Sequence, residues 1–148
     1  MYQEHLIMTA RMALDDSWTV VPWEGGIKCT WSFIGPLTKQ AYQAYRPQAD
    51  RPFAGFRLTE LPGCCGVVVS HDTQVYPRGV GLGTWLQGLK EKIALGAGFS
   101  LLVGTDIVYS ETTPQVRLFD KCGWKKYLEF SNARTGNNVA LYAKDLRK

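Results

Sequence analysis

The chain has 148 residues, a length that suits one domain able to bury a core of its own. Hydrophobic residues make up 45% and charged residues 20% of the sequence, which is ordinary for a folded protein and excludes a disordered chain. No apolar run approaches the ~18 residues that span a bilayer, and charged residues interrupt the first 16 positions, which excludes a membrane helix and a secretion signal. We therefore expect one cytoplasmic domain over residues 1–148.

The four cysteines show no pattern of a metal site or a disulfide framework. They are Cys29, Cys64, Cys65 and Cys122. None belongs to a CxxC pair, and neither histidine has metal-site spacing to a cysteine. We expect reduced, structural thiols and no metal.

The first half of the chain predicts a helix, a strand, a short helix and a hairpin. Residues 2–16 are rich in helix formers, although their spacing also fits strand alternation. Residues 27–34 are β-branched and aromatic and predict a strand. Residues 37–45 predict a short helix. Residues 53–59 and 65–70 flank a Pro-Gly turn and predict an antiparallel hairpin whose second strand is continuously apolar, as in the middle of a sheet.

A helix with a clear apolar face follows, within residues 78–98. The residues expected on that face are Leu82, Trp85, Leu86, Leu89, Ile93 and Ala97. The residues expected away from it are Gln87, Lys90, Glu91 and Lys92. Residues 99–104 then predict a second buried strand, so that strand, loop, helix and strand form a βαβ unit.

The C-terminal part predicts one short helix and a final hairpin. Residues 112–121 carry an early proline, which a first helical turn tolerates. Residues 124–130 and 139–144 read as strands joined by the turn-rich residues 131–138. The whole pattern predicts an α+β fold.

The loop before the long helix carries the chemistry. Its sequence is Arg78-Gly79-Val80-Gly81-Leu82-Gly83. A helix start presents unpaired N–H groups and the positive end of the helix dipole, glycines let the backbone approach an anion, and Arg78 adds charge. No lysine follows Gly83, which excludes a Walker loop, and Thr84 replaces the third glycine of a dinucleotide fingerprint. The loop therefore predicts a phosphate or pyrophosphate site.

This loop fits R/Q-x-x-G-x-G/A and resembles the pyrophosphate loop of the GNAT acetyltransferase family. The stretch from Leu118 to Trp124 is similar to the family's L-Y-x-x-x-G-F segment. The resemblance is clearest over residues 65–145. It implies a central, mixed, mostly antiparallel twisted sheet flanked by helices, with acetyl-CoA as co-substrate and transfer of the acetyl group to a primary amine in a ternary complex.

By the same resemblance, the strand around Val68 splays from the strand of residues 101–104, and the pantetheine arm lies between them. A backbone N–H near Val68 then polarises the thioester carbonyl. The residues implied to bind the cofactor are Val67, Val68, Val69, Arg78, Gly79, Val80, Gly81, Leu82, Gly83, Thr84, Thr112 and Phe119.

The proton-transfer groups are a point of departure from the family. Phe119 stands where the family often has a tyrosine acid, and a phenyl ring cannot donate a proton. Tyr109, His71 and Glu111 are the candidate catalytic residues, and Ser110 and Asp106 are nearby alternatives. Trp18 and Trp23 either line an acceptor pocket or pack under a loop.

Three functions follow from these patterns. The leading one is acetyl transfer from acetyl-CoA to a small-molecule or macromolecular amine. A second is a coenzyme A-binding module without catalysis, which Phe119 motivates. A third is a protein that binds nucleic acid or modifies an amine-bearing base, using its excess of four positive charges. An exposed edge strand could also support a homodimer.

Overall fold

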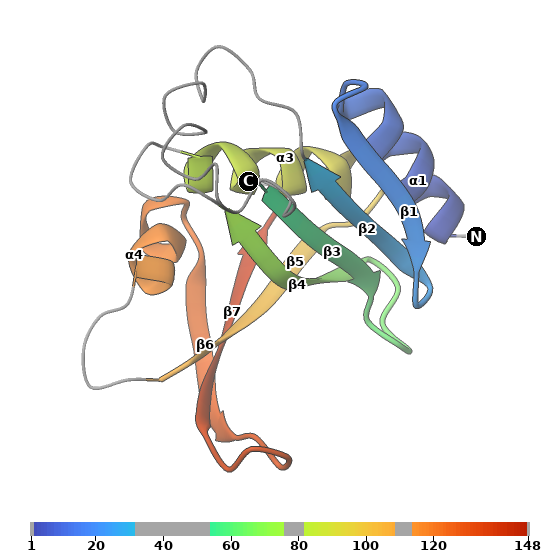
Figure 1. Ribbon diagram of the computed structural model, residues 1–148. Helices are drawn as coiled ribbons and strands as arrows, with labels where there is room; N and C mark the ends of the chain where they lie inside the picture. Colours follow the sequence, from blue (N-terminus) through green and yellow to red (C-terminus); the bar gives the residue numbers. More distant parts are fainter. Residues whose placement is uncertain (1, 32–53, 76–81, 109–113, 148) are drawn as a thin grey trace.

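The structure is a computed structural model, and it describes residues 2–31, 54–75, 82–108 and 114–147 (Figure 1). The described helices are α1 (Tyr2–Ala13), α3 (Leu82–Gly96) and α4 (Pro114–Lys121). The described strands are β1 (Trp18–Trp23), β2 (Gly26–Trp31), β3 (Ala54–Glu60), β4 (Val67–Val75), β5 (Leu101–Ile107), β6 (Lys125–Ser131) and β7 (Asn138–Asp145). The α+β prediction is confirmed. The predicted helix at residues 37–45 lies outside the described residues.

The strands form one seven-stranded sheet in the order β1-β2-β3-β4-β5-β7-β6. Among the described strands, only β4 and β5 pair in parallel, and every other neighbouring pair is antiparallel. The parallel pair is the βαβ unit expected from the sequence, with α3 as its crossover. The mixed, mostly antiparallel sheet is therefore confirmed.

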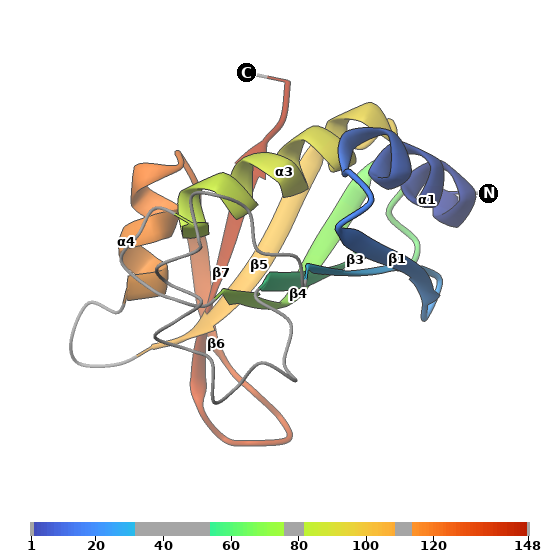
Figure 2. The ribbon, with the colours of Figure 1, turned by 45° about the horizontal axis from the view of Figure 1, so that its top comes forward.

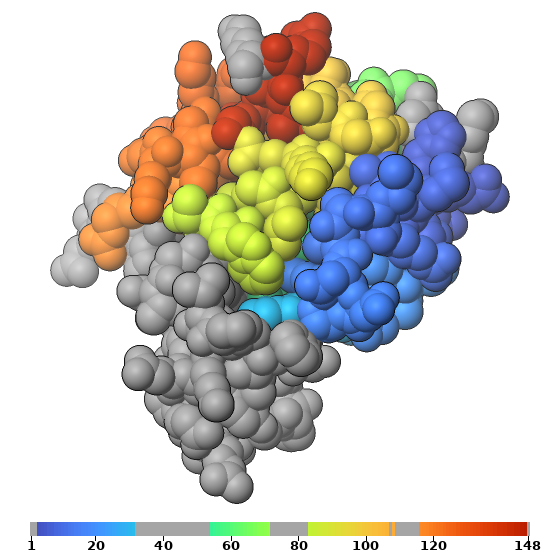
Figure 3. Space-filling view, turned by 90° about the horizontal axis from the view of Figure 1, so that it is seen from above, coloured from blue at the N-terminus to red at the C-terminus, as the bar shows by residue number. Residues whose placement is uncertain are grey.

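The described helices lie side by side over one face of the sheet (Figures 2 and 3). Alternate residues of the central strands point into the layer between sheet and helices, as the pleat of a strand requires. The largest buried apolar side chains of this core include Leu6, Ile27, Phe56, Leu58, Leu86, Ile93, Phe99 and Leu102. No helix among the described residues is long and apolar enough to cross a membrane.

Strand β1 was not predicted. It pairs with β2 through a tight hairpin whose central residues, Glu24 and Gly25, have φ of 44° and 79°. Two successive positive φ values are typical of a type I′ turn. Pro22 argues against a central strand, because a proline has no N–H to donate to a neighbouring strand. Strand β1, however, lies at the edge of the sheet, where a missing N–H is tolerated.

The buried face of α3 differs from the predicted one. Trp85 remains 39% exposed, whereas Gln87 and Lys90 are 0% and 1% exposed. At ~100° per residue, the buried face is turned by roughly 70° from the one that the apolar residues indicate. Trp85 contacts Trp31 and Trp18 instead, with ring centroids 5.0 and 5.9 Å away. The prediction that Trp85 is core and that Gln87 and Lys90 face solvent is therefore wrong.

Candidate functional site

Strands β4 and β5 separate after a short paired segment. Their register joins Val67 to Leu101, Val68 to Leu102 and Val69 to Val103 and then ends, although β4 continues to Val75 and β5 to Ile107. We call residues 70–75 and 104–107 the divergent segments, and Figure 1 shows the two strands fanning apart there. The three valines expected to bind the pantetheine arm are thus paired with β5, and the divergence begins one residue later.

An irregularity in β4 lies within its divergent segment. Gly55 pairs with Gln74 and Arg57 pairs with His71, so Phe56 of β3 stands opposite two residues of β4, Asp72 and Thr73. This is the arrangement of a β-bulge, which leaves one backbone unit out of the regular ladder and bends the strand. Backbone N–H groups near the bulge can therefore aim at a bound molecule in place of a neighbouring strand.

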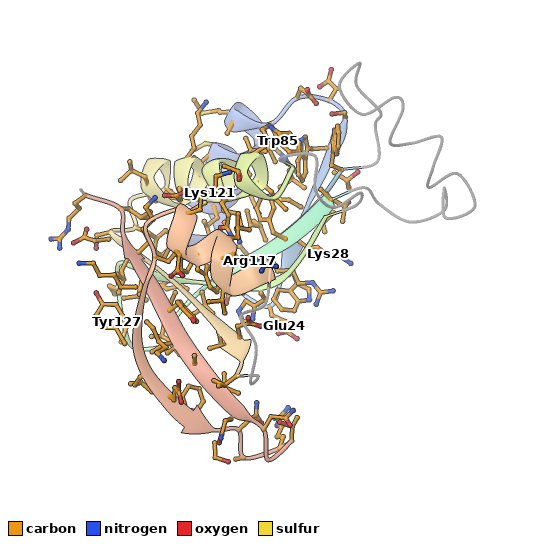
Figure 4. The ribbon with its side chains drawn as sticks, turned by 90° about the vertical axis from the view of Figure 1, so that its left-hand side faces the viewer. Glu24, Lys28, Trp85, Arg117, Lys121 and Tyr127 are labelled. Atoms are coloured by element: carbon orange, nitrogen blue, oxygen red, sulfur yellow. The ribbon has the colours of Figure 1, made fainter. Side chains whose placement is uncertain are left out.

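Helix α3 begins at the end of β4 where the strands diverge. The loop residues Arg78, Gly79, Val80 and Gly81 lie outside the described residues, and the structure describes the helix from Leu82. An added Cβ at Gly83 would lie 3.3 Å from a methyl of Leu118, so the first turn of α3 packs closely on α4. That turn has no acidic residue, and Thr84 is exposed beside it. Arg117 adds a cation on the exposed side of α4 (Figure 4).

His71 lies on the face of the sheet opposite the helices. It belongs to a cross-strand row with Arg57 and Lys28, and Figure 4 shows Lys28 on the side of the strands away from α3. The imidazole Nε2 is 2.7 Å from the Thr59 hydroxyl oxygen, and the Trp23 ring meets the imidazole edge-on at 5.5 Å. The Arg57 guanidinium stacks over Trp23 at 4.6 Å. The structure thus brings two expected site residues, Trp23 and His71, together in a basic, aromatic surface.

Phe119 is buried in the helix-side layer. Its ring lies 4.6 Å from the rings of both Trp124 and Tyr142, and it closes over Gly104, the first residue of the divergent part of β5. An added Cβ at Gly104 would lie 3.4 Å from Trp124 and 3.6 Å from Phe119. Phe119 therefore shapes the divergent segment by packing against the β5 backbone. Trp18, the other tryptophan considered for an acceptor pocket, is buried in the core.

Two polar residues of α3 that the sequence predicted to face solvent, Gln87 and Lys90, are buried. Lys90 donates a hydrogen bond of 2.9 Å from Nζ to the hydroxyl of Ser70, the first residue of the divergent part of β4. Burial lowers the pKa of Lys90 to about 7, against smaller opposing effects of Glu91 and Cys122. The amide atoms of Gln87 are buried with no hydrogen-bond partner among the described residues. A buried unpaired amide costs about 1–3 kcal/mol, which calls for a functional explanation.

Sequence reasoning missed these two residues because apolar periodicity assigns lysine and glutamine to the surface. The only sequence signal is that Gln87 and Lys90 are three residues apart, which places them on the same side of a helix. Of the other candidates, Asp106 is half-buried in β5. Those outside the described residues are Tyr109, Ser110, Glu111 and Thr112. All four cysteines are free, but Cys64 and Cys65 are exposed, so only Cys29 is a buried structural thiol.

The sheet order, the parallel pair that diverges and the crossover helix that starts beside it define the fold of the GNAT acetyltransferases. A search of solved structures finds a Desulfovibrio desulfuricans protein described as a GNAT-family acetyltransferase, with a TM-score of 0.58 and 18% identity. That match covers 66% of this chain and 64% of the other, so the chain spans less than two thirds of that protein.

Two further structures with this fold are described with a bound ligand. An aminoglycoside 6′-N-acetyltransferase complexed with coenzyme A matches with a TM-score of 0.58 and 15% identity, over 81% of this chain and 72% of the other. A Salmonella typhimurium protein described with its cofactor acetyl-CoA matches with a TM-score of 0.53 and 15% identity, over 71% and 69%. No protein-family model matches the sequence, and no curated protein is significantly similar to it.

Proposed function

We propose that the chain binds acetyl-CoA and transfers the acetyl group to a primary amine. The observation that carries this proposal is the end of β4–β5 pairing at Val69 and Val103, on the side of the sheet where α3 begins. Backbone groups of the divergent segments that no neighbouring strand occupies can bond an extended, amide-bearing arm, as an additional strand would. The start of α3 can bind the pyrophosphate at the end of that arm.

The proposed cofactor contacts follow from this arrangement. Arg78 and the backbone from Gly79 to Thr84 bind the pyrophosphate, with Arg117 of α4 as an additional cation nearby. The arm lies along β4 beyond Val69, where the strand no longer pairs with β5. Thr112 remains a proposed contact from the sequence, and Phe119 acts indirectly, by packing under β5.

Acyl transfer then requires two changes of bonding and two proton movements. The amine nitrogen forms a bond to the thioester carbonyl carbon, and the bond from carbon to sulfur breaks. The amine loses a proton to a base, and the released thiolate gains one. Most of the rate enhancement would come from holding both reactants in place, with a backbone N–H at the bulge polarising the carbonyl.

We propose His71 as the acceptor of the amine proton, because it lies beside the bulge on the face opposite the helices. The Thr59 hydroxyl orients its ring. Lys28 and Arg57 on the same face disfavour a protonated amine and favour an acceptor that also carries an anionic group. Tyr109 and Glu111 remain alternative proton-transfer groups from the sequence. The protonation of the thiolate can proceed without a protein acid, because a thiol of pKa ~8.5 is a tolerable leaving group.

The experiment that tests this proposal is thermal unfolding with coenzyme A, acetyl-CoA, NAD and ATP, on the wild type and Gly81→Glu. A ligand at ~100 times its Kd stabilises the fold by about 2.7 kcal/mol. Gly88→Glu is the matched control, since it places the same charge at an exposed glycine of α3 with no atom within 4 Å of an added Cβ. We expect stabilisation by the two coenzyme A ligands that Gly81→Glu alone abolishes.

The outcomes separate the three candidate functions. Stabilisation by coenzyme A with thiol release in the presence of amines supports the transferase. Stabilisation without thiol release from any of a broad set of amines would support a non-catalytic coenzyme A-binding module. No stabilisation by either ligand would remove the basis of the proposal, and salt-sensitive nucleic-acid binding would then be measured next.

A further inference from the structure

The carboxamide of Gln87 is the most unusual polar group of the described chain. Only two residues have buried side-chain nitrogen or oxygen atoms without a hydrogen-bond partner there: Gln87, through both amide atoms, and Trp124, through Nε1. Native proteins leave few such groups, and each one calls for an unseen partner or a functional reason. For Gln87, the group to be identified is the one that forms hydrogen bonds with the amide in the functional protein.

Contacts around α3 show which strand Gln87 faces. Lys90 points to β4, where it bonds Ser70, and Glu91 points to β7, where it pairs with Lys144. At ~100° per residue around the helix axis, Glu91 lies about 100° from Lys90. Gln87 lies between them, about 60° from Lys90. Strand β5 stands between β4 and β7 in the sheet, so Gln87 faces β5.

The position of Gln87 along the helix places it over the divergent segments. Helix α3 leads into the start of β5, where Leu101 pairs with Val67, so its first turn lies towards the other ends of these strands. Gln87 is three residues, or about 4.5 Å, nearer to that first turn than Lys90. Because Lys90 already reaches Ser70 at the start of the divergence, Gln87 lies beyond it, beside the part of β5 that no longer pairs with β4.

We propose that the Gln87 carboxamide is a binding contact for an amide group of the pantetheine arm. The inference rests on the proposed function, because it requires the arm to enter between the divergent segments. Each secondary amide of pantetheine has one N–H donor and one carbonyl acceptor, and a glutamine carboxamide offers the complementary acceptor and donor. The buried amide, which has no partner among the described residues, thus becomes paired in the complex, so Gln87 favours the arm over an apolar chain of equal length.

The test is Gln87→Met, which keeps the length of the side chain and removes its polar atoms. Two ligands are used: coenzyme A, and adenosine 3′,5′-bisphosphate, which lacks the arm. We expect the Kd for coenzyme A to rise about tenfold, the value for one lost hydrogen bond to a buried polar group, and the Kd for the bisphosphate to stay unchanged. We also expect the free variant to unfold a few degrees higher than the wild type, because an unpaired buried amide has been removed.

The matched control is Leu86→Met, which changes the neighbouring buried residue of α3 without touching a polar group. It should leave both Kd values unchanged. A second measurement does not depend on any variant folding: the side-chain NH₂ signals of Gln87 in ¹⁵N-labelled protein should shift with coenzyme A and not with the bisphosphate.

The outcomes distinguish this inference from the proposed function. If the wild type binds no coenzyme A, the proposed function is wrong, and the inference is overturned with it. If the wild type binds coenzyme A and Gln87→Met binds it equally well, only the inference is overturned. A free variant that is also less stable than the wild type would then show that an internal water pairs with the amide.

Discussion

Nζ of Lys90 donates a 2.9 Å hydrogen bond to the hydroxyl of Ser70, which joins the crossover helix to the first residue of β4 that no longer pairs with β5. The two residues are 20 positions apart and meet only because α3 folds back over β4. This bond holds α3 against β4 where the strands start to diverge. Lys90 itself, a titratable residue, is buried in the protein interior.

The first prediction concerns the pH dependence of stability. In the folded state the pKa of Lys90 is about 7, and its ordinary value is 10.5. Between these values the unfolded chain binds the proton and the folded chain does not, so the free energy of unfolding rises with pH. Relative to Lys90→Met, the wild type should gain about 2 kcal/mol between pH 7 and pH 9, measured by urea unfolding.

A second buried group titrates above this range, which is why the wild type is compared with Lys90→Met. Burial raises the pKa of Cys29 to about 12, so above pH 9 the unfolded chain loses a thiol proton that the folded chain keeps, and stability falls. Both proteins share this effect, which the comparison with Lys90→Met cancels. Parallel curves for the two proteins from pH 7 to pH 9 would show that Lys90 stays protonated when buried.

The second prediction concerns His71 as proton acceptor. His71→Asn should lower kcat by about 100-fold or more, with little change in the Kd for coenzyme A, because the ring accepts a proton and does not bind the cofactor. Thr59→Val should lower kcat less, since it removes only the group that orients the ring. Thiol release is the measurement. The control is His5→Asn on the exposed side of α1; equal activity of both histidine variants would place the base elsewhere.

The third prediction concerns Trp85, which is 39% exposed yet packed against two indole rings. Trp85→Ala should lower the free energy of unfolding by about 2 kcal/mol, because the contacts with Trp18 and Trp31 are lost. Leu95→Ala, at a position of α3 that is 52% exposed, should change it by less than about 0.5 kcal/mol. Urea unfolding followed by circular dichroism avoids the change in tryptophan fluorescence.

The fourth prediction uses two glycines with opposite surroundings. A Cβ at Gly26 would overlap the backbone carbonyl of Leu58, so Gly26→Ala must push β2 and β3 apart and should destabilise by about 3 kcal/mol. A Cβ at Gly88 meets nothing, and alanine has the higher helix propensity, so Gly88→Ala should stabilise by about 0.5–1 kcal/mol. A Gly26→Ala protein as stable as the wild type would contradict the close β2–β3 approach.

Several elements could be predicted because their signals are local. Strand patterns and turn residues defined two of the three described hairpins, β3–β4 and β6–β7, and the glycine loop before an amphipathic segment defined the start of α3. The resemblance to the GNAT family rested on that loop and on the stretch from Leu118 to Trp124. Strand β1 was missed because its proline is acceptable only at a sheet edge, and edge position depends on how the whole sheet assembles.

The sequence by itself determined the described helices, most of the described strands, and the parallel unit of β4, α3 and β5, because these depend on periodicity and on residues close together in the chain. Only the tertiary structure decided which side of α3 faces the sheet. Hydrophobic periodicity records the average preference of each side chain for water, whereas Lys90 is buried because Ser70 comes from another strand to accept its hydrogen bond. The same long-range packing decided that β4 and β5 part after Val69 and that the Gln87 side chain is buried.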